Sequence, residues 1–126
     1  MNALCQHTLI EYHDCDAARL CGAEDLRVAL REAVRAAGGT IVTDVFHTFS
    51  PYGVTGVVVI AESHVTIHTW PEHGYAAVDI FSCSEKLDHG AIKAALRAVL
   101  GAQRDTSRTL ERGTPTSFAA GAVTRR

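Results

Sequence analysis

Three segments rich in β-branched residues follow one another closely between residues 54 and 83. They are VTGVVVIA (54–61), HVTIHTW (64–70) and YAAVDIFSC (75–83), with short connections between them. Successive strands with such connections pair in an antiparallel manner, because a parallel pair needs a much longer crossover. The sequence therefore predicts an antiparallel β-sheet as the centre of the fold.

Two segments show the periodicity of amphipathic helices. One lies within residues 23–39 and ends at a pair of glycines, and the other follows Asp88, whose side chain can cap the first turn. The expected buried faces are Leu26, Ala29, Leu30, Ala33, Val34 and Ala37 in the first helix, and Ile92, Ala95, Leu96, Val99 and Leu100 in the second. Both helices are therefore expected to pack an apolar face against the sheet.

The order of the elements predicts the fold class. The remaining expected elements are strands at 3–12, 40–49 and 106–113 and a turn at 50–53. Together with the hairpin-length connections, this order predicts an α+β two-layer sandwich, a mainly antiparallel sheet with two helices on one face. Since no linker divides the chain, residues 1–113 are expected to form one domain and residues 114–126 a flexible tail.

The composition is that of a folded chain that does not cross a membrane. The longest apolar runs, such as Val57 to Ala61, are far shorter than the roughly 20 residues that span a bilayer. The N-terminus lacks the basic region and apolar core of a secretory signal. The 12 basic and 14 acidic residues are nearly balanced, which argues against a nucleic-acid surface. We therefore expect a cytoplasmic protein with no membrane or nucleic-acid partner.

The four cysteines, Cys5, Cys15, Cys21 and Cys83, include no CxxC pair. Neither a zinc ribbon nor a thioredoxin-type motif is therefore predicted. In a reducing compartment all four are expected to be free thiols, and free cysteines in proteins are commonly half-buried and inert.

The histidines of HVTIHTW allow two simple interpretations. On a helix, His64 and His68 would share a face and could bind zinc, but the β-branched residues between them and Pro71 after them favour a strand. In a strand they lie about 13 Å apart, too far to share one ion, so no metal site is predicted. The other interpretation is an ordinary polar row of His64, Thr66 and His68 on one face of a sheet.

A longer stretch is more specific. The segment ESHVTIHTWPEHGYAAVDIFSC, preceded by FHTFSPYGVTGVVVIA, resembles the signature region of the short prokaryotic S-adenosylmethionine decarboxylase proenzymes. The similarity runs from about His7 to Gly113. It combines the Glu-Ser pair at 62–63, the IHTWPE block and the cysteine at 83 in matching spacing.

The resemblance implies that the chain makes its own cofactor. In that family the chain cleaves itself, here between Glu62 and Ser63, to give chains 1–62 and 63–126. The Ser63 hydroxyl attacks the Glu62 carbonyl to form an ester, and β-elimination followed by hydrolysis leaves a pyruvoyl group in place of Ser63. No pyridoxal phosphate and no metal is then required.

The resemblance also assigns roles to two processing residues. His68 assists processing, as suits an imidazole that exchanges protons near neutral pH. Thr55 stands where many relatives carry a processing serine, and its hydroxyl can make the same hydrogen bond. Because Ser63 and His68 are five residues apart, they would point to opposite faces of a flat strand. Either the backbone bends at Glu62-Ser63 or strand pairing brings the two residues together differently.

For decarboxylation, the resemblance makes the pyruvoyl ketone the electron sink that forms a Schiff base with the substrate amine. Cys83 is the implied proton donor, since a thiol is largely protonated at neutral pH. The implied substrate-binding residues are the aromatic Phe49 and Trp70 and the carboxylate Glu72, with Glu11 as a further candidate. Phe49 and Trp70 are equally compatible with a place in the hydrophobic core.

The implied activity is conversion of S-adenosylmethionine to its decarboxylated form, an aminopropyl donor for spermidine biosynthesis. Arginine or ornithine is the alternative substrate, because pyruvoyl chemistry needs only an α-amino acid, and a homologue that never processes is a third reading. Departures from the family pattern at Thr48, Thr55 and Ser84 bear on substrate identity more than on mechanism. The family also implies a homodimer with active sites at the interface.

Overall fold

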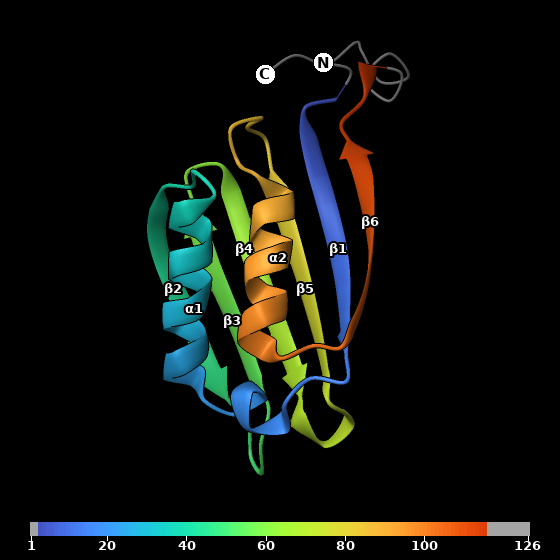
Figure 1. Ribbon diagram of the computed structural model, residues 1–126. Helices are drawn as coiled ribbons and strands as arrows, with labels where there is room; N and C mark the ends of the chain where they lie inside the picture. The colour runs from blue at the N-terminus through green and yellow to red at the C-terminus, as the bar shows by residue number, and fades with distance from the viewer. Residues whose placement is uncertain (1–2, 116–126) are drawn as a thin grey trace.

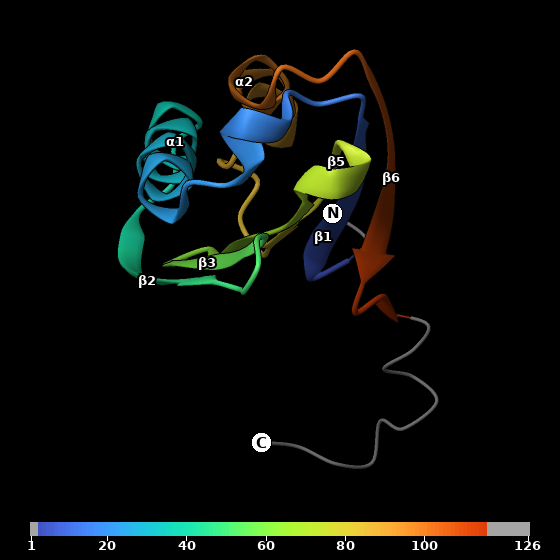
Figure 2. The same ribbon diagram turned by 90° about the horizontal axis from the view of Figure 1, so that it is seen from below.

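The predicted strands pair into one antiparallel sheet, and both predicted helices lie on the same face of it (Figure 1). The computed structural model describes residues 3–115. Seen along the strands, the helices form one layer and the sheet the other (Figure 2). The expected α+β two-layer sandwich is therefore confirmed, whereas the expected tail at 114–126 lies outside the described residues from position 116 onward.

The elements agree closely with the segments expected from the sequence. The strands are β1 (Cys5–His13), β2 (Ile41–Thr48), β3 (Val54–Ile60), β4 (Ser63–Trp70), β5 (Tyr75–Ser82) and β6 (Arg104–Arg112). The helices are α1 (Ala23–Ala36) and α2 (His89–Leu100), with short 3₁₀ helices η1 (Ala17–Leu20) and η2 (Pro71–His73). Within residues 3–115, no helix is long and apolar enough to span a bilayer.

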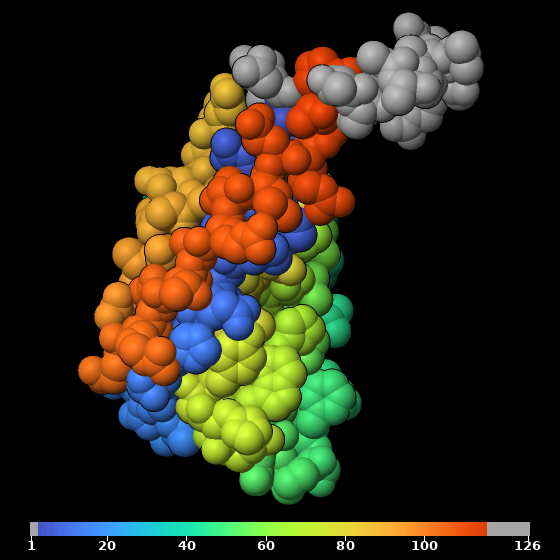
Figure 3. Space-filling view, turned by 90° about the vertical axis from the view of Figure 1, so that its right-hand side faces the viewer, coloured from blue at the N-terminus to red at the C-terminus, as the bar shows by residue number. Residues whose placement is uncertain are grey.

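The strand order in the sheet is β2-β3-β4-β5-β1-β6. The four strands from β2 to β5 are neighbours in both sequence and space, whereas β1 lies between β5 and β6. The β3–β4 turn and the loop after β5 lie at one end of the sheet, uppermost in Figure 1. Residues 49–53 and η2 lie at the opposite end. The strand β6 runs along one side of the molecule with most of its residues exposed (Figure 3).

The core lies between the helices and the covered face of the sheet. Its fully buried residues include Leu30 of α1, Leu96 of α2 and Ile67 of β4. Most of the helix positions expected to be buried are buried. Three positions are exceptions: Ala29 and Ala95 are half-buried and Val99 is 37% exposed. Together with Val28 they border a shallow groove between the two helices.

Gly56 of β3 allows an aromatic side chain to lie against the strand. A Cβ atom at this position would come within 2.1 Å of the Phe46 ring, which comes from the paired residue on β2. The guanidinium of Arg27 on α1 lies over the Phe46 ring, with its central carbon 5.1 Å from the ring centre. Phe46 thereby joins the outermost strand β2 to helix α1.

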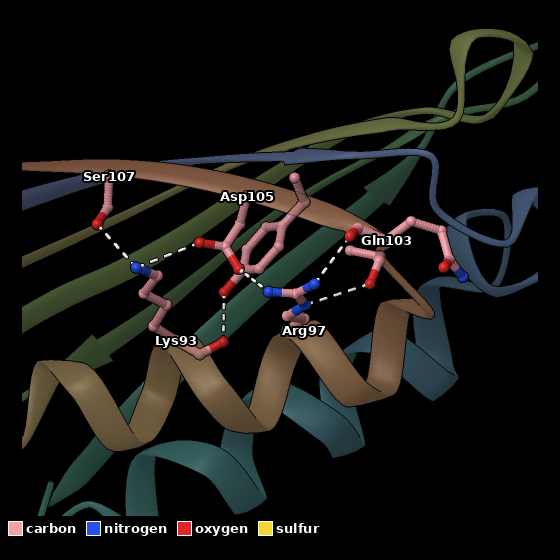
Figure 4. Close-up of polar contacts among 7 residues, drawn as sticks. Lys93, Arg97, Gln103, Asp105 and Ser107 are labelled. Carbon is pink, nitrogen blue, oxygen red and sulfur yellow. Dashed lines mark hydrogen bonds and ion pairs between the residues drawn. The ribbon is translucent and has the colours of Figure 1, made fainter.

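A polar network joins α2 to β6 and β1 (Figure 4). The Asp105 carboxylate accepts a hydrogen bond of 2.8 Å from Arg97 and lies 3.2 Å from the Lys93 ammonium group. Lys93 also donates to the Ser107 hydroxyl, and its carbonyl accepts a 2.7 Å hydrogen bond from Tyr12. Burial, with the nearby Asp105 charge, raises the pKa of Tyr12 far above its ordinary value, so the hydroxyl remains a donor.

We expect Asp105→Asn to lower the free energy of unfolding by about 1–2 kcal/mol, because Arg97 and Lys93 would lose a shared carboxylate whose side chain is only 10% exposed. Asp14→Asn is the matched control, since Asp14 pairs with Arg104 in solvent at 58% exposure. Its expected effect is within about 0.5 kcal/mol. Thermal unfolding of both variants measures this difference, and equal shifts would contradict the role given to Asp105.

Candidate active site

Apart from Glu11, the expected site residues fall into two groups at opposite ends of the sheet. Glu62, Ser63 and Cys83 lie where the β3–β4 turn meets the loop after β5, and we call them the cleavage cluster. The second group lines a pocket near residues 49–53 and η2, which we call the aromatic pocket. Its lining residues are Phe49, Tyr52, Gly53, Val54, Thr55, His68, Thr69, Trp70 and Glu72.

Ser63 begins β4 in an unusual backbone conformation. Its φ angle is 149°, a region that side-chain-bearing residues rarely adopt. It follows directly on the two-residue turn of Ala61 and Glu62, and it pairs with Ile60 across the hairpin. Because backbone strain of this kind persists only where the surroundings impose it, the Glu62-Ser63 peptide bond is held in a strained turn.

Hydrogen bonds from two other segments hold this turn. The carbonyl of Thr40, just before β2, accepts from the Ala61 N–H at 2.8 Å, and the Thr40 N–H donates to the Glu62 carboxylate at 3.0 Å. The Glu62 main-chain carbonyl accepts a 3.0 Å hydrogen bond from the Cys83 N–H. The carbonyl next to Ser63 is therefore both positioned and polarised by a backbone donor.

Cys83 is joined to Cys5 in a disulfide. The expectation that all four cysteines are free thiols is therefore wrong for this pair, while Cys15 and Cys21 are free. The register of β1 and β5 places the two residues opposite each other, one position beyond the Gln6 and Ser82 pair. The sulfur of Cys83 also lies 3.5 Å from the Ser63 hydroxyl oxygen, so the cleavage cluster contains a sulfur, a hydroxyl and the polarised carbonyl.

His89 stabilises the end of β5 from the helix side. Its Nε2 lies 2.8 Å from the Ser82 hydroxyl and its Nδ1 lies 2.7 Å from the Thr8 hydroxyl. Burial lowers the pKa of His89, so the neutral ring donates one of these hydrogen bonds and accepts the other. Thr8 of β1 and Ser82 of β5 are thus bridged next to the two disulfide-bonded cysteines.

The aromatic pocket has a volume of about 300 Å³. Phe49 and Trp70 are 49% and 41% exposed, which rules out the alternative that they belong to the core. Tyr52 adds a third aromatic side chain, and Glu72 is the one carboxylate among the described lining residues. Within the pocket, the Thr55 hydroxyl and His68 Nδ1 lie 3.0 Å apart in a hydrogen bond between paired residues of β3 and β4.

Glu11 lies outside the aromatic pocket. It borders a separate hollow with Leu9 and residues of β6. Its carboxylate accepts a hydrogen bond from the Tyr75 hydroxyl, and burial together with this carboxylate raises the pKa of Tyr75 to about 12. The Tyr75 ring in turn lies 5.3 Å from that of Trp70. Glu11 therefore supports the aromatic side chains around the pocket without lining it.

Ser63 and His68 remain apart within one chain. Although the backbone is bent at Ser63, both residues belong to β4, and five residues of strand correspond to roughly 16 Å. Their partners on β3 are likewise separate, Ile60 for Ser63 and Thr55 for His68. The bend therefore does not bring the imidazole to the Ser63 hydroxyl.

His64 takes part in a cluster of its own on the uncovered face of the sheet. Its Nε2 lies 3.5 Å from the Asp79 carboxylate, and its ring stacks on that of Phe81 with the ring centres 5.5 Å apart. His7 also lies 3.6 Å from Asp79. His64 and His68 lie on a strand, as expected, and among residues 3–115 no three His, Cys, Asp or Glu side chains are arranged to hold a metal ion.

Several residues of the site were not expected from the sequence. Thr40 and Cys5 contact the cleavage cluster only through strand pairing and turn packing, which no local pattern reveals. Tyr52, in contrast, can be recognised from the sequence, since it lies in the turn predicted at 50–53 directly after Phe49. An aromatic residue in a turn between two strands is expected to be exposed, so Tyr52 could have been included among the candidates.

Comparisons with known proteins agree with one another. A family model described as S-adenosylmethionine decarboxylase matches residues 6–113. A proenzyme of that name from Thermosipho africanus is 47% identical over 104 residues, covering 82% of this chain and 80% of the relative. One from Parasynechococcus marenigrum is 45% identical over 114 residues, covering 90% and 89%.

A solved structure shows the same architecture. The adenosylmethionine decarboxylase from Aquifex aeolicus superposes with a TM-score of 0.78 at 36% identity, covering 90% of this chain and 93% of that one. The family model's range of residues 6–113 includes both helices, Glu62, Ser63 and Cys83, and the aromatic pocket. The chain belongs to the S-adenosylmethionine decarboxylase family.

Proposed function

We propose that this protein cleaves itself between Glu62 and Ser63, converts Ser63 to a pyruvoyl group and decarboxylates S-adenosylmethionine. The observation that carries the proposal is the geometry at the β3–β4 turn. A serine with a φ angle of 149° follows a carbonyl that is hydrogen-bonded by the Cys83 N–H, and the Cys83 sulfur lies 3.5 Å from the serine hydroxyl. An ordinary hairpin requires none of these features.

The turn supports each part of the cleavage chemistry. Attack of the Ser63 hydroxyl on the Glu62 carbonyl puts negative charge on that oxygen, where the Cys83 N–H stabilises it. The C–N bond then breaks to give an ester and a free amine. Loss of the Ser63 α-proton expels the Glu62 carboxylate and leaves dehydroalanine, which water converts to pyruvoyl and ammonia. The residues present therefore fit the precursor of this cofactor.

In decarboxylation, the pyruvoyl group supplies the electron sink that allows carbon dioxide to leave. Cys83 is the proposed proton donor to the substrate carbon, because its sulfur adjoins the position of Ser63. This role needs the reduced thiol. A reducing compartment such as the cytoplasm, where we place the working enzyme, maintains that state.

The aromatic pocket supports a nucleoside substrate. Phe49, Tyr52 and Trp70 offer faces for an adenine ring and a sulfonium cation, and Glu72 offers a carboxylate for the ribose hydroxyls. Its volume of about 300 Å³ is at the small end for a ligand site. A pocket for the distal cation of arginine or ornithine would be expected to present more than one acidic group.

We further propose that the working form is a homodimer in which each active site uses both protomers. His68 and the aromatic pocket lie roughly 16 Å along β4 from Ser63 in one chain, too far to act on it directly. The uncovered face of the sheet also carries exposed apolar residues, among them Val45 (67% exposed), Val59 and Leu110. Two such faces packed about a two-fold axis would bring the aromatic pocket of one protomer to the cleavage cluster of the other.

Purified protein should consist of two chains, 1–62 and 63–126, with the N-terminus of the second blocked by pyruvoyl. Incubated separately with carboxyl-labelled S-adenosylmethionine, arginine and ornithine, it should release carbon dioxide from the first at least about 10-fold faster than from the others. Mass spectrometry and trapped label measure both results. Faster release from arginine or ornithine would show that this amino acid, and not S-adenosylmethionine, is the substrate. An intact 13.5 kDa chain would contradict the enzymatic proposal as a whole.

A further inference from the structure

Cys5 and Cys83 are held face to face by two neighbouring strands. Cys5 begins β1 and Cys83 directly follows β5, and the ladder between these strands runs from Gln6 opposite Ser82 to Tyr12 opposite Ala76. The Cα atoms of the two cysteines are 4.1 Å apart, and the sulfurs are bonded. Their meeting is therefore fixed by seven paired positions of sheet and does not depend on a mobile loop.

The surroundings hold this pair in place from the helix side as well. His89 bridges the hydroxyls of Thr8 and Ser82, one on each strand, at 2.7 and 2.8 Å. Within one protomer Cys83 is exposed and Cys5 is half-buried. In the proposed dimer, the opening that admits the substrate to Cys83 is the route by which a small disulfide reaches the same sulfur.

We propose that Cys5 is a reversible redox lock on Cys83, closed by low-molecular-weight disulfides such as glutathione disulfide. A thiolate of the pair attacks the small disulfide, forming a mixed disulfide and releasing one glutathione. The other cysteine then attacks the protein sulfur and releases the second glutathione. Overall, two cysteine thiols are oxidised and one glutathione disulfide is reduced to two glutathione molecules.

The lock rests on the proposed role of Cys83 as the proton donor. In the disulfide the sulfur carries no proton, so Cys83 cannot protonate the substrate carbon. Its main-chain N–H remains free to bind the Glu62 carbonyl, as it does in the disulfide-bonded structure. Oxidation should therefore stop decarboxylation but leave self-cleavage able to proceed.

Cleavage gives the lock a direct signature. Cys5 belongs to chain 1–62 and Cys83 to chain 63–126, so the disulfide links the two products covalently. On a denaturing gel without reductant, the locked enzyme should migrate as one linked species, and with dithiothreitol as two chains. Because this readout is independent of catalysis, it separates failure of the lock from failure of the proposed function.

The test titrates cleaved enzyme with defined ratios of glutathione disulfide to glutathione. We expect decarboxylation to fall by about 10²-fold or more as the linked species forms, and to return with dithiothreitol. Cys5→Ser should need at least about a 10-fold higher ratio for half-inactivation, because it leaves only the bimolecular reaction at Cys83. Cys21→Ser, which removes an exposed free cysteine, should behave as the wild type.

Equal sensitivity of Cys5→Ser and wild type, absence of the linked species, or full activity of the linked species would each overturn the lock. An uncleaved chain should instead show loss of two hydrogen atoms on oxidation, which mass spectrometry detects. If that chain forms the disulfide but decarboxylates nothing under reducing conditions, the proposed function fails while the cysteine pairing stands.

Discussion

Replacing Ser63 with alanine is expected to abolish self-cleavage completely, leaving a single chain of about the wild-type 13.5 kDa. Alanine has no hydroxyl to attack the Glu62 carbonyl, which the Cys83 N–H holds beside residue 63. Without cleavage there is no pyruvoyl group, so decarboxylation should also fall to background. Intact mass and carbon dioxide release measure the two losses.

Ser84→Ala is the matched control for this variant. Ser84 follows Cys83, and its hydroxyl accepts a hydrogen bond from the Lys86 N–H rather than contacting the Glu62-Ser63 bond. We expect it to cleave at the wild-type rate. Cleavage of the Ser63→Ala chain at the same position would show that another nucleophile acts there, and would refute the proposed origin of the cofactor.

The second large effect concerns His68 and tests the shared active site. Alone, His68→Ala should slow self-cleavage by about 10²–10⁴-fold, as expected for loss of an acid–base group. When it is co-expressed with Ser63→Ala, cleavage should return in the His68→Ala chains. A mixed dimer contains one site with the intact Ser63 of one chain and the intact His68 of the other. With random pairing, about half of the His68→Ala chains enter such dimers.

His64→Ala provides the control, because His64 lies on the same strand and the same face but interacts with Asp79 and Phe81. It should cleave nearly normally alone. Mass spectrometry distinguishes the chains and counts the cleaved fraction of each. If the co-expressed His68→Ala chains stay uncleaved while dimers form, His68 does not act across the interface, and the composite site is wrong.

The local parts of this fold were predictable because their signals are local. The hairpins from β2 to β5 follow from short connections and β-branched runs, and Asp88 caps α2 as expected, accepting from the Ala91 N–H. The position of β1 between β5 and β6 has no such signal, since it depends on pairing between residues far apart in the sequence. The contact of Cys5 with Cys83 depends on that pairing and could not be predicted.

The sequence names candidate site residues, but it does not predict how they are arranged in space. Strand alternation predicted that Ser63 and His68 do not meet on a flat strand. The structure has a bend at Ser63 that still leaves the two residues apart. Phe49 and Trp70 remained ambiguous, because an aromatic residue beside a turn has the same local pattern whether buried or exposed. Their exposure depends on the three-dimensional arrangement of the aromatic pocket, in which both side chains are exposed.

The strand order has a consequence for the cleaved protein. Chain 1–62 would contribute β1, β2 and β3, and chain 63–126 would contribute β4, β5 and β6. In the sheet, β1 of the first chain is clamped between β5 and β6 of the second, while β3 pairs with β4. The two fragments are thus interleaved, and separating them requires breaking three strand ladders at once. The proposed cut would change the covalent connectivity of the molecule, while the hydrogen-bonded sheet would keep its two products together as one folded body.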